Sequence, residues 1–190
     1  MDSIDKIYVD DAVKESHITR KILSYHSNIE TEVVANSPNN FSYRHTQSGK
    51  KIYLTKSKGD IIKGCPGTGE DYLCCRYQII NQTENCPLNC TYCILQYYLN
   101  TELITIYTNF NEIYKELADK LTKQPDRFFR VGTGELSDSL ALPGSRKFAK
   151  GLVERLSIRD NLLLELKTKT GNIEDILSLN NKSVVLSWSL

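Results

Sequence analysis

The chain has 190 residues, of which 40% are hydrophobic and 25% are charged. This hydrophobic share excludes a disordered chain and predicts a packed core. The 24 Lys and Arg residues nearly balance the 23 Asp and Glu residues, which excludes an argument for nucleic-acid binding from bulk positive charge.

Residues 1–50 are polar, with a weak helical pattern over 12–24 and a turn-rich stretch over 35–40, and we interpret them as an N-terminal extension. Residues 51–190 alternate between two patterns. Strands are predicted over 51–55, 77–80, 103–107, 127–131, 161–166 and 183–187. Helices are predicted over 90–99, 111–121, 146–156 and 172–179.

Alternation of strands and helices favours βα units and a parallel sheet. Right-handed crossovers would place the helices on one side, as in a (β/α) barrel or part of one. The last predicted strand is followed by no helix, so we expect a partial barrel whose C-terminal strands are missing.

The N-terminal residues and the length of the apolar runs also predict the cellular location of the protein. Residues 1–6 carry acidic side chains where a signal peptide would carry basic and then apolar ones. No apolar run approaches the roughly 18 residues of a membrane helix. We therefore expect a soluble, cytoplasmic protein with no membrane partner.

All six cysteines lie between Cys65 and Cys93. Local clustering of this kind, without an export signal, indicates metal or redox chemistry rather than a disulfide scaffold. Cys86, Cys90 and Cys93 form a C-x3-C-x2-C motif at the end of a predicted strand. Their offsets allow three thiolates to converge, and three thiolates leave one iron of a [4Fe-4S] cluster open for another ligand.

The alternative is a zinc site, in which the three motif cysteines take a fourth ligand from another cysteine. The spacing is not that of paired C-x2-C knuckles, which argues against it. The remaining cysteines are interpreted as buried structural thiols: Cys65, Cys74 and Cys75.

The motif resembles that of the radical S-adenosylmethionine (SAM) superfamily. The runs 74–80, 85–99 and 127–138 are similar to the spore photoproduct lyase-like (DNA photolyase-like) family, and the resemblance covers roughly residues 50–190. The resemblance implies that residues 51–190 form a radical SAM domain, a partial (β/α) barrel that is truncated at its C-terminus. It also implies a lyase-like enzyme that acts in DNA repair. The three motif cysteines would hold a [4Fe-4S] cluster, and the methionyl group of SAM would chelate the open iron. An external electron donor of the flavodoxin or ferredoxin type would supply the electron that cleaves SAM, and the 5'-deoxyadenosyl radical would abstract a hydrogen.

The resemblance also implies which residues bind SAM. Tyr92 would lie near the adenine, although it is equally suited to covering the cluster from solvent. The segment Gly132-Thr133-Gly134-Glu135 would approach SAM closely and bind its ammonium group, the alternative being a tight turn with a solvated glutamate. The methionyl carboxylate would be contacted by Lys169 and Ser187, unless Lys169 is an ordinary loop lysine.

One departure from the family bears on the substrate. Its hydrogen-donor cysteine aligns with Glu135, and no cysteine follows Cys93. Catalytic residues are therefore not assigned. DNA stays a partner by resemblance, with two alternatives: a radical SAM enzyme acting on a non-DNA substrate, and a non-catalytic zinc or iron–sulfur binding fragment. A loose basic patch precedes the motif and is interpreted as a solvated face rather than a DNA contact: Lys50, Lys51, Lys56, Lys58 and Lys63.

Overall fold

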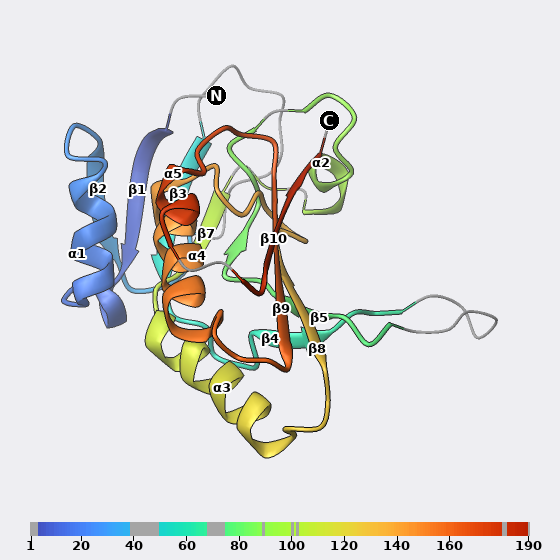
Figure 1. Cartoon of the computed structure of the whole chain (residues 1–190). Coiled ribbons are helices and arrows are strands. Elements are labelled where there is room, and N and C mark those ends of the chain that lie inside the picture. The colour runs from blue at the N-terminus through green and yellow to red at the C-terminus, as the bar shows by residue number, and fades with distance from the viewer. Residues whose placement is uncertain are drawn as a thin grey trace. The chain divides into compact units, whose positions relative to one another are not determined.

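The structure, a computed structural model, describes residues 4–38, 50–67, 75–88, 90–99, 101, 103–179 and 182–189. The chain divides into two compact units, shown with their labelled elements in Figure 1. The first unit combines residues 1–58 with 82–109, and the second combines 59–81 with 110–190. Among the described residues, no helix has both the length and the apolar character of a membrane span.

The first unit is built on a five-stranded sheet with the order β2-β1-β3-β7-β6. Strands β2, β1, β3 and β7 run parallel to their neighbours, and β6 runs antiparallel to β7. Its elements are β1 (Ile4–Asp10), the 3-10 turn η1 (Asp11–Val13), α1 (His17–Ser24), β2 (Glu30–Val34), β3 (Lys50–Thr55), β6 (Thr83–Glu84), α2 (Leu95–Tyr98) and β7 (Leu103–Tyr107).

The N-terminal residues take part in this sheet, because β1 pairs with both β2 and β3. At the end of β1, the Asp10 carboxylate accepts hydrogen bonds from Tyr53 Oη at 2.9 Å, Thr55 Oγ1 at 2.7 Å and Ala12 N at 2.9 Å. Burial alone would raise the pKa of Asp10, but these donors outweigh it and hold the pKa below its ordinary value. The domain boundary at residue 50 stays a prediction, and strands on both sides of it share one sheet. The helix predicted over 12–24 begins only at His17.

The second unit carries a sheet with the order β10-β9-β8-β5-β4. Strands β5, β8, β9 and β10 are parallel, and β4 pairs antiparallel with β5. Its elements are β4 (Ile62–Gly64), β5 (Gln78–Ile80), α3 (Phe110–Lys123), β8 (Phe129–Thr133), α4 (Pro143–Leu156), β9 (Leu162–Thr168), α5 (Glu174–Leu177) and β10 (Val184–Trp188). The predicted α/β alternation is confirmed over this part of the chain.

The two faces of the second sheet differ because side chains alternate along a strand. On β9, Leu162, Leu164 and Leu166 are buried, whereas Glu165 is half-buried and Lys167 is exposed. In Figure 1, α3, α4 and α5 lie on one side of β8, β9 and β10. The helices cover the leucine face, so the opposite face of this sheet carries the charged side chains.

The core between α3 and α4 contains three aromatic rings. Phe110 packs edge-on against Phe148 at 5.1 Å between ring centroids, and Tyr114 stacks on Phe148 at 5.2 Å. The Tyr114 hydroxyl donates to the Phe148 carbonyl at 3.0 Å, so the buried phenol is satisfied. This packing fixes the helices that follow and precede β8.

Candidate functional site

The cysteine motif lies in the first unit, in the loop between β6 and α2. The base of this loop is fixed by Asn85, which has a φ of 68° and a buried side chain. Its Nδ2 donates to the carbonyls of Thr101 at 2.6 Å and Leu103 at 3.3 Å, and its Oδ1 accepts from Cys86 N at 2.8 Å. An asparagine tolerates the left-handed backbone and supplies both kinds of hydrogen bond, which explains this residue type directly before the motif.

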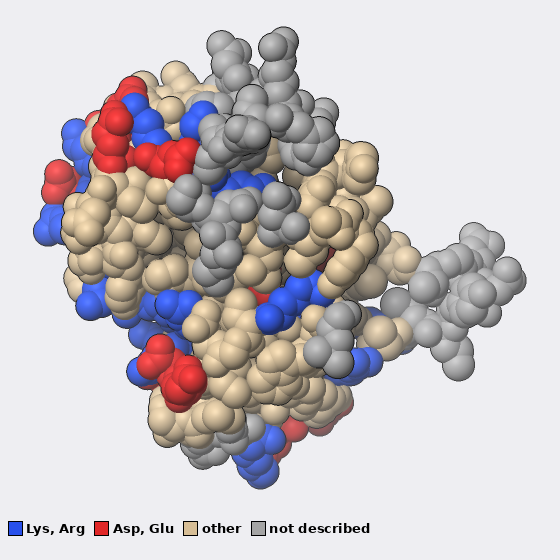
Figure 2. All heavy atoms as spheres, turned by 90° about the horizontal axis from the view of Figure 1, so that it is seen from above, with Lys and Arg blue, Asp and Glu red and all other residues tan. Residues whose placement is uncertain are grey.

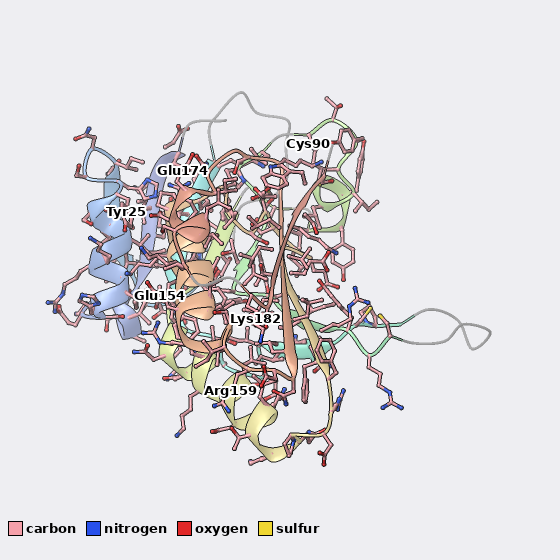
Figure 3. All side chains as sticks on the ribbon, viewed as in Figure 1. Tyr25, Cys90, Glu154, Arg159, Glu174 and Lys182 are labelled. Atoms are coloured by element: carbon pink, nitrogen blue, oxygen red, sulfur yellow. The ribbon has the colours of Figure 1, made fainter. Side chains whose placement is uncertain are left out.

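The second and third cysteines share one backbone turn. Cys93 N donates to the Cys90 carbonyl at 3.0 Å, and Gln96 Nε2 donates to the same carbonyl at 2.7 Å. The short helix α2 continues this turn, which confirms part of the helix predicted over 90–99. Figure 3 labels Cys90 beside α2. Cys90 and Cys93 carry free thiols and are half-buried, as is Cys86.

The thiol chemistry of this loop suits an iron–sulfur cluster, but the described side chains do not form a closed site. Within the residues that the structure describes, no three Cys, His, Asp or Glu side chains lie close enough together to hold a metal ion. Cluster ligation by Cys86, Cys90 and Cys93 therefore remains a prediction that rests on their spacing and on their common loop.

The surface beside the motif is aromatic. Tyr92 is 71% exposed, and Ile94, Tyr97 and Tyr98 are equally prominent at the surface. Stacking of Tyr92 on adenine stays a prediction.

The other cysteines overturn one expectation. Cys65 and Cys75 are exposed free thiols rather than buried structural ones, and Cys74 lies outside the described residues. Cys65 directly follows β4, and its N–H donates to the Tyr77 carbonyl at 2.8 Å. Both thiols therefore belong to the connection between β4 and β5, and both are exposed. The hairpin was not visible in the pattern of residues 61–76.

Apart from Tyr92, which lies in the first unit, the predicted SAM-binding residues lie in the second unit, at or near the carboxyl ends of neighbouring parallel strands. Gly132 and Thr133 end β8, Lys169 follows β9, and Ser187 is near the end of β10. Gly134 adopts a φ of 89°, and a Cβ atom there would lie 2.8 Å from Ser139 Oγ. Only glycine fits this turn without strain.

The turn after β8 is tied firmly to the end of β9. Asp138 is buried, and its carboxylate accepts from Leu140 N at 2.8 Å, Thr168 Oγ1 at 2.8 Å and Lys169 N at 2.7 Å. Ser139 adds two more bonds, from its N–H to the Lys167 carbonyl at 2.9 Å and from Lys167 N to its Oγ at 3.0 Å. These bonds position the Gly134 turn, and no local sequence pattern marks Asp138 or Ser139 for this role.

Two polar groups at this turn have unused hydrogen-bonding capacity among the described residues. Ser137 Oγ is buried and has no hydrogen-bond partner among the described residues, which is an unsatisfied group of the kind that a ligand completes. Glu135 is exposed and accepts from Asn81 Nδ2 at 2.8 Å, so its other oxygen can accept from a cation. Lys169 Nζ donates to the carbonyl of Ser189 at 3.0 Å and to its hydroxyl at 2.9 Å.

A close contact with Tyr77 explains why position 132 is a glycine, and the sequence alone did not indicate this contact. A Cβ atom at this position would lie 1.7 Å from Tyr77 Oη, so the tyrosine ring occupies the space above the glycine. The Tyr77 hydroxyl donates to Glu165 Oε2, and Arg130 and Lys167 lie over the ring at 5.6 Å and 5.4 Å from its centroid. Burial, followed by the bond to Glu165, raises the pKa of Tyr77 well above its ordinary value.

Charges on the surface are mixed. On the face seen in Figure 2, Lys and Arg side chains are interspersed with Asp and Glu over the described residues. The basic residues of the loose patch are half-buried or exposed: Lys50, Lys51, Lys56, Lys58 and Lys63.

No protein-family model and no curated protein matches the chain. Solved structures of spore photoproduct lyase do match. One cysteine variant and the complex with dinucleoside spore photoproduct each align with a TM-score of 0.80 at 14% sequence identity. Another variant, with bound AdoMet and dinucleoside spore photoproduct, aligns with a TM-score of 0.79 at 14% identity. Each alignment covers 99% of this chain and 56% of the other. The chain therefore has the partial radical SAM-type α/β fold of spore photoproduct lyase, and it spans about half of that protein's length.

Proposed function

We propose that the chain is a radical SAM protein of the spore photoproduct lyase-like type, which binds a [4Fe-4S] cluster and SAM. The observation that carries this proposal is the C-x3-C-x2-C loop after a strand, in a chain with the fold of spore photoproduct lyase. One of the matching structures contains AdoMet, which supports SAM as the ligand.

The proposed residues have separate tasks. Cys86, Cys90 and Cys93 hold the cluster, which when bound supplies the electron that cleaves SAM, after reduction by a flavodoxin or ferredoxin type donor. Tyr92 stacks on the adenine. The segment Gly132-Thr133-Gly134-Glu135, together with Lys169 and Ser187, binds the methionyl part. The unsatisfied Ser137 hydroxyl and the open oxygen of Glu135 support a polar ligand at this turn.

We propose a DNA lesion as the substrate class, because the matching structures include complexes with dinucleoside spore photoproduct. A second candidate is a radical SAM reaction on a different substrate. It is favoured by Glu135, which occupies the position where the family has its hydrogen-donor cysteine. A glutamate does not donate a hydrogen atom readily, so either another donor or another reaction is required.

The test is SAM cleavage by the reconstituted chain. Under anaerobic conditions with a reductant, we expect 5'-deoxyadenosine and methionine to form in equal amounts and the Cys90→Ala variant to form neither. DNA that contains spore photoproduct should stimulate the reaction if the lesion is the substrate. Cleavage without stimulation by DNA would favour the second candidate, and no cleavage together with no SAM binding would overturn the proposal.

A further inference from the structure

Among the described strands, β10 is the sheet edge that is least protected from pairing with another chain. The two sheets end in the edge strands β2 and β6 in the first unit and β10 and β4 in the second. Strands β6 and β4 have two and three residues, and β2 exposes Glu30 and Glu32. Short length and charge are the usual devices that keep an edge from pairing. Strand β10 has five residues and carries no charge, proline or glycine.

The hydrogen bonds between β10 and β9 show which backbone groups of β10 point outward. Leu164 N donates to the Ser183 carbonyl at 2.8 Å, and Ser189 N donates to the Thr168 carbonyl at 3.0 Å. In a parallel pair, alternate residues bond to the same neighbour, so the odd-numbered residues of β10 face β9. The N–H and C=O groups of its even-numbered residues therefore point away from β9: Val184, Leu186 and Trp188.

The side chains of β10 are incompletely covered as well. Val184 and Leu186 are half-buried, although the leucines that they pair with on β9 are fully buried on the same face of the sheet. Trp188 also belongs to this face and is 48% exposed, and Val185 on the opposite face is 39% exposed. Removing this apolar row from water would stabilise an assembly.

We propose that β10 pairs antiparallel with β10 of a second copy of this chain, around a two-fold axis at Leu186. In this register Leu186 pairs with Leu186 of the partner subunit, and Val184 pairs with Trp188 of the partner subunit. Every outward N–H of both strands then has an outward carbonyl as its acceptor. A two-fold axis perpendicular to the sheet places the apolar face of one copy beside that of the other, and it gives a closed dimer.

The side chains and charges agree with this register. A tryptophan opposite a valine is a favourable cross-strand pair. Residues 183–190 contain no charged side chain, so no like charges oppose the approach of a second copy. The paired strands span only about 16 Å, which is less than a standard interface of roughly 1,200–2,000 Å² requires. We therefore expect a weak dimer, with a dissociation constant on the order of 10 μM.

The test is the mass of the full chain in sedimentation velocity, from concentrations well below this dissociation constant to well above it. A reductant keeps the exposed thiols Cys65 and Cys75 from forming disulfides between chains. We expect the monomer to convert into a dimer and into nothing larger. Trp188 is the single tryptophan, so its fluorescence should shift to shorter wavelength as the dimer forms.

Val185→Lys introduces the charge that protects other edges. In the monomer the new lysine lies beside Glu165, which pairs with position 185, so the fold should tolerate it. In the dimer it places two lysines diagonally across the axis, about 7–8 Å apart. We expect the dissociation constant to rise by about tenfold or more. Val33→Lys, the same change at an exposed position of β2, is the matched control and should leave the dimer unchanged.

Amide hydrogen exchange, followed by NMR on the wild type at low and high concentration, decides the inference even if Val185→Lys does not fold. We expect exchange to slow at the outward amides of Val184, Leu186 and Trp188, and to stay unchanged at Val185 and Ser187, which face β9.

Three results would overturn the inference. A monomer at all concentrations leaves the β10 edge to a strand from another polypeptide. A dimer that keeps its outward β10 amides unprotected is formed by another surface. A series of species larger than the dimer means open aggregation rather than a closed pair. No cofactor enters this test, so its outcome does not depend on the proposed function.

Discussion

Gly132→Ala tests whether the contact between Tyr77 and Glu165 stabilises the second unit, on the face of the sheet that carries the charged side chains. The added Cβ would lie 1.7 Å from Tyr77 Oη and 2.5 Å from Cζ. Ordinary carbon contacts lie near 3.5–4.0 Å, so the ring must move by about 2 Å. The phenol cannot move that far and keep its hydrogen bond to Glu165.

The cost follows from the bond that is lost. A hydrogen bond to a charged group contributes about 1.5–3 kcal/mol, and replacing a strand glycine by alanine returns about 0.5–1 kcal/mol. We therefore expect Gly132→Ala to lower the free energy of unfolding by about 1–2 kcal/mol, which is roughly 2–8 °C in Tm for a chain of this size. The single tryptophan, Trp188 on β10, provides a fluorescence signal from the same unit.

A double-mutant cycle separates this cause from general strand effects. In a Tyr77→Leu background the ring is absent, so Gly132→Ala should cost nothing or stabilise slightly. Gly171→Ala is the matched control, because no atom lies within 4 Å of a Cβ placed there. The reasoning is refuted if Gly132→Ala unfolds like the wild type, or if its cost is the same in both backgrounds.

Three further predictions follow from the second unit. Glu135→Ala should weaken SAM binding by about ten- to a hundredfold while iron content is unchanged, and an unchanged affinity in calorimetry would show that Glu135 is only a turn residue. Asp138→Asn should lower the free energy of unfolding by about 1–3 kcal/mol, because the new side-chain NH2 group would face a backbone N–H that the carboxylate now accepts from. A variant as stable as the wild type in denaturant titration would contradict the role of this carboxylate. The pKa of Glu165 is lowered in the folded state, so the stability that its ionised form contributes is present above its ordinary pKa of 4.5 and is lost as the pH falls below it. Glu165→Gln should therefore differ from the wild type at pH 7 and approach it near pH 3 in thermal unfolding, and a constant difference across this range would refute the assignment.

The sequence predicted the second unit well because its elements have clear periodicity. Apolar spacing predicted a helix over 111–121, and α3 spans Phe110–Lys123. The helix predicted over 146–156 begins earlier, at Pro143, where the missing N–H of proline is tolerated. The apolar runs over 161–166 and 183–187 predicted strands, and β9 and β10 cover Leu162–Thr168 and Val184–Trp188.

Pairing between distant strands was not predictable from the sequence. The strand over 103–107 belongs to the alternating series of the sequence, yet β7 pairs with β3 and β6 in the first unit, and β5 pairs directly with β8 in the second. Similarly, β1 and β2 join a sheet with β3, although the polar composition of residues 1–50 suggested an extension. A strand's pattern indicates its buried face but not its neighbour.

In the candidate site, too, local motifs were predictable from the sequence and contacts between distant residues were not. The cysteine motif and the glycine turn have recognisable spacings, so they were found from local sequence. The contact between Tyr77 and Glu165 joins residues 88 positions apart, and Asp138 acts through residues on another strand end. No local signal reports such contacts. The exposure of Cys65 and Cys75 was missed because it depends on a hairpin that short polar segments do not reveal.

The most direct test of the central claim is the metal content of the anaerobically reconstituted chain. We expect about four irons and four sulfides per chain, with a broad visible absorption. Cys90→Ala should lose both, whereas Cys65→Ala, which removes an exposed thiol outside the motif, should keep both. Stoichiometric zinc without a visible band, or an iron content that Cys90→Ala does not change, would contradict the account.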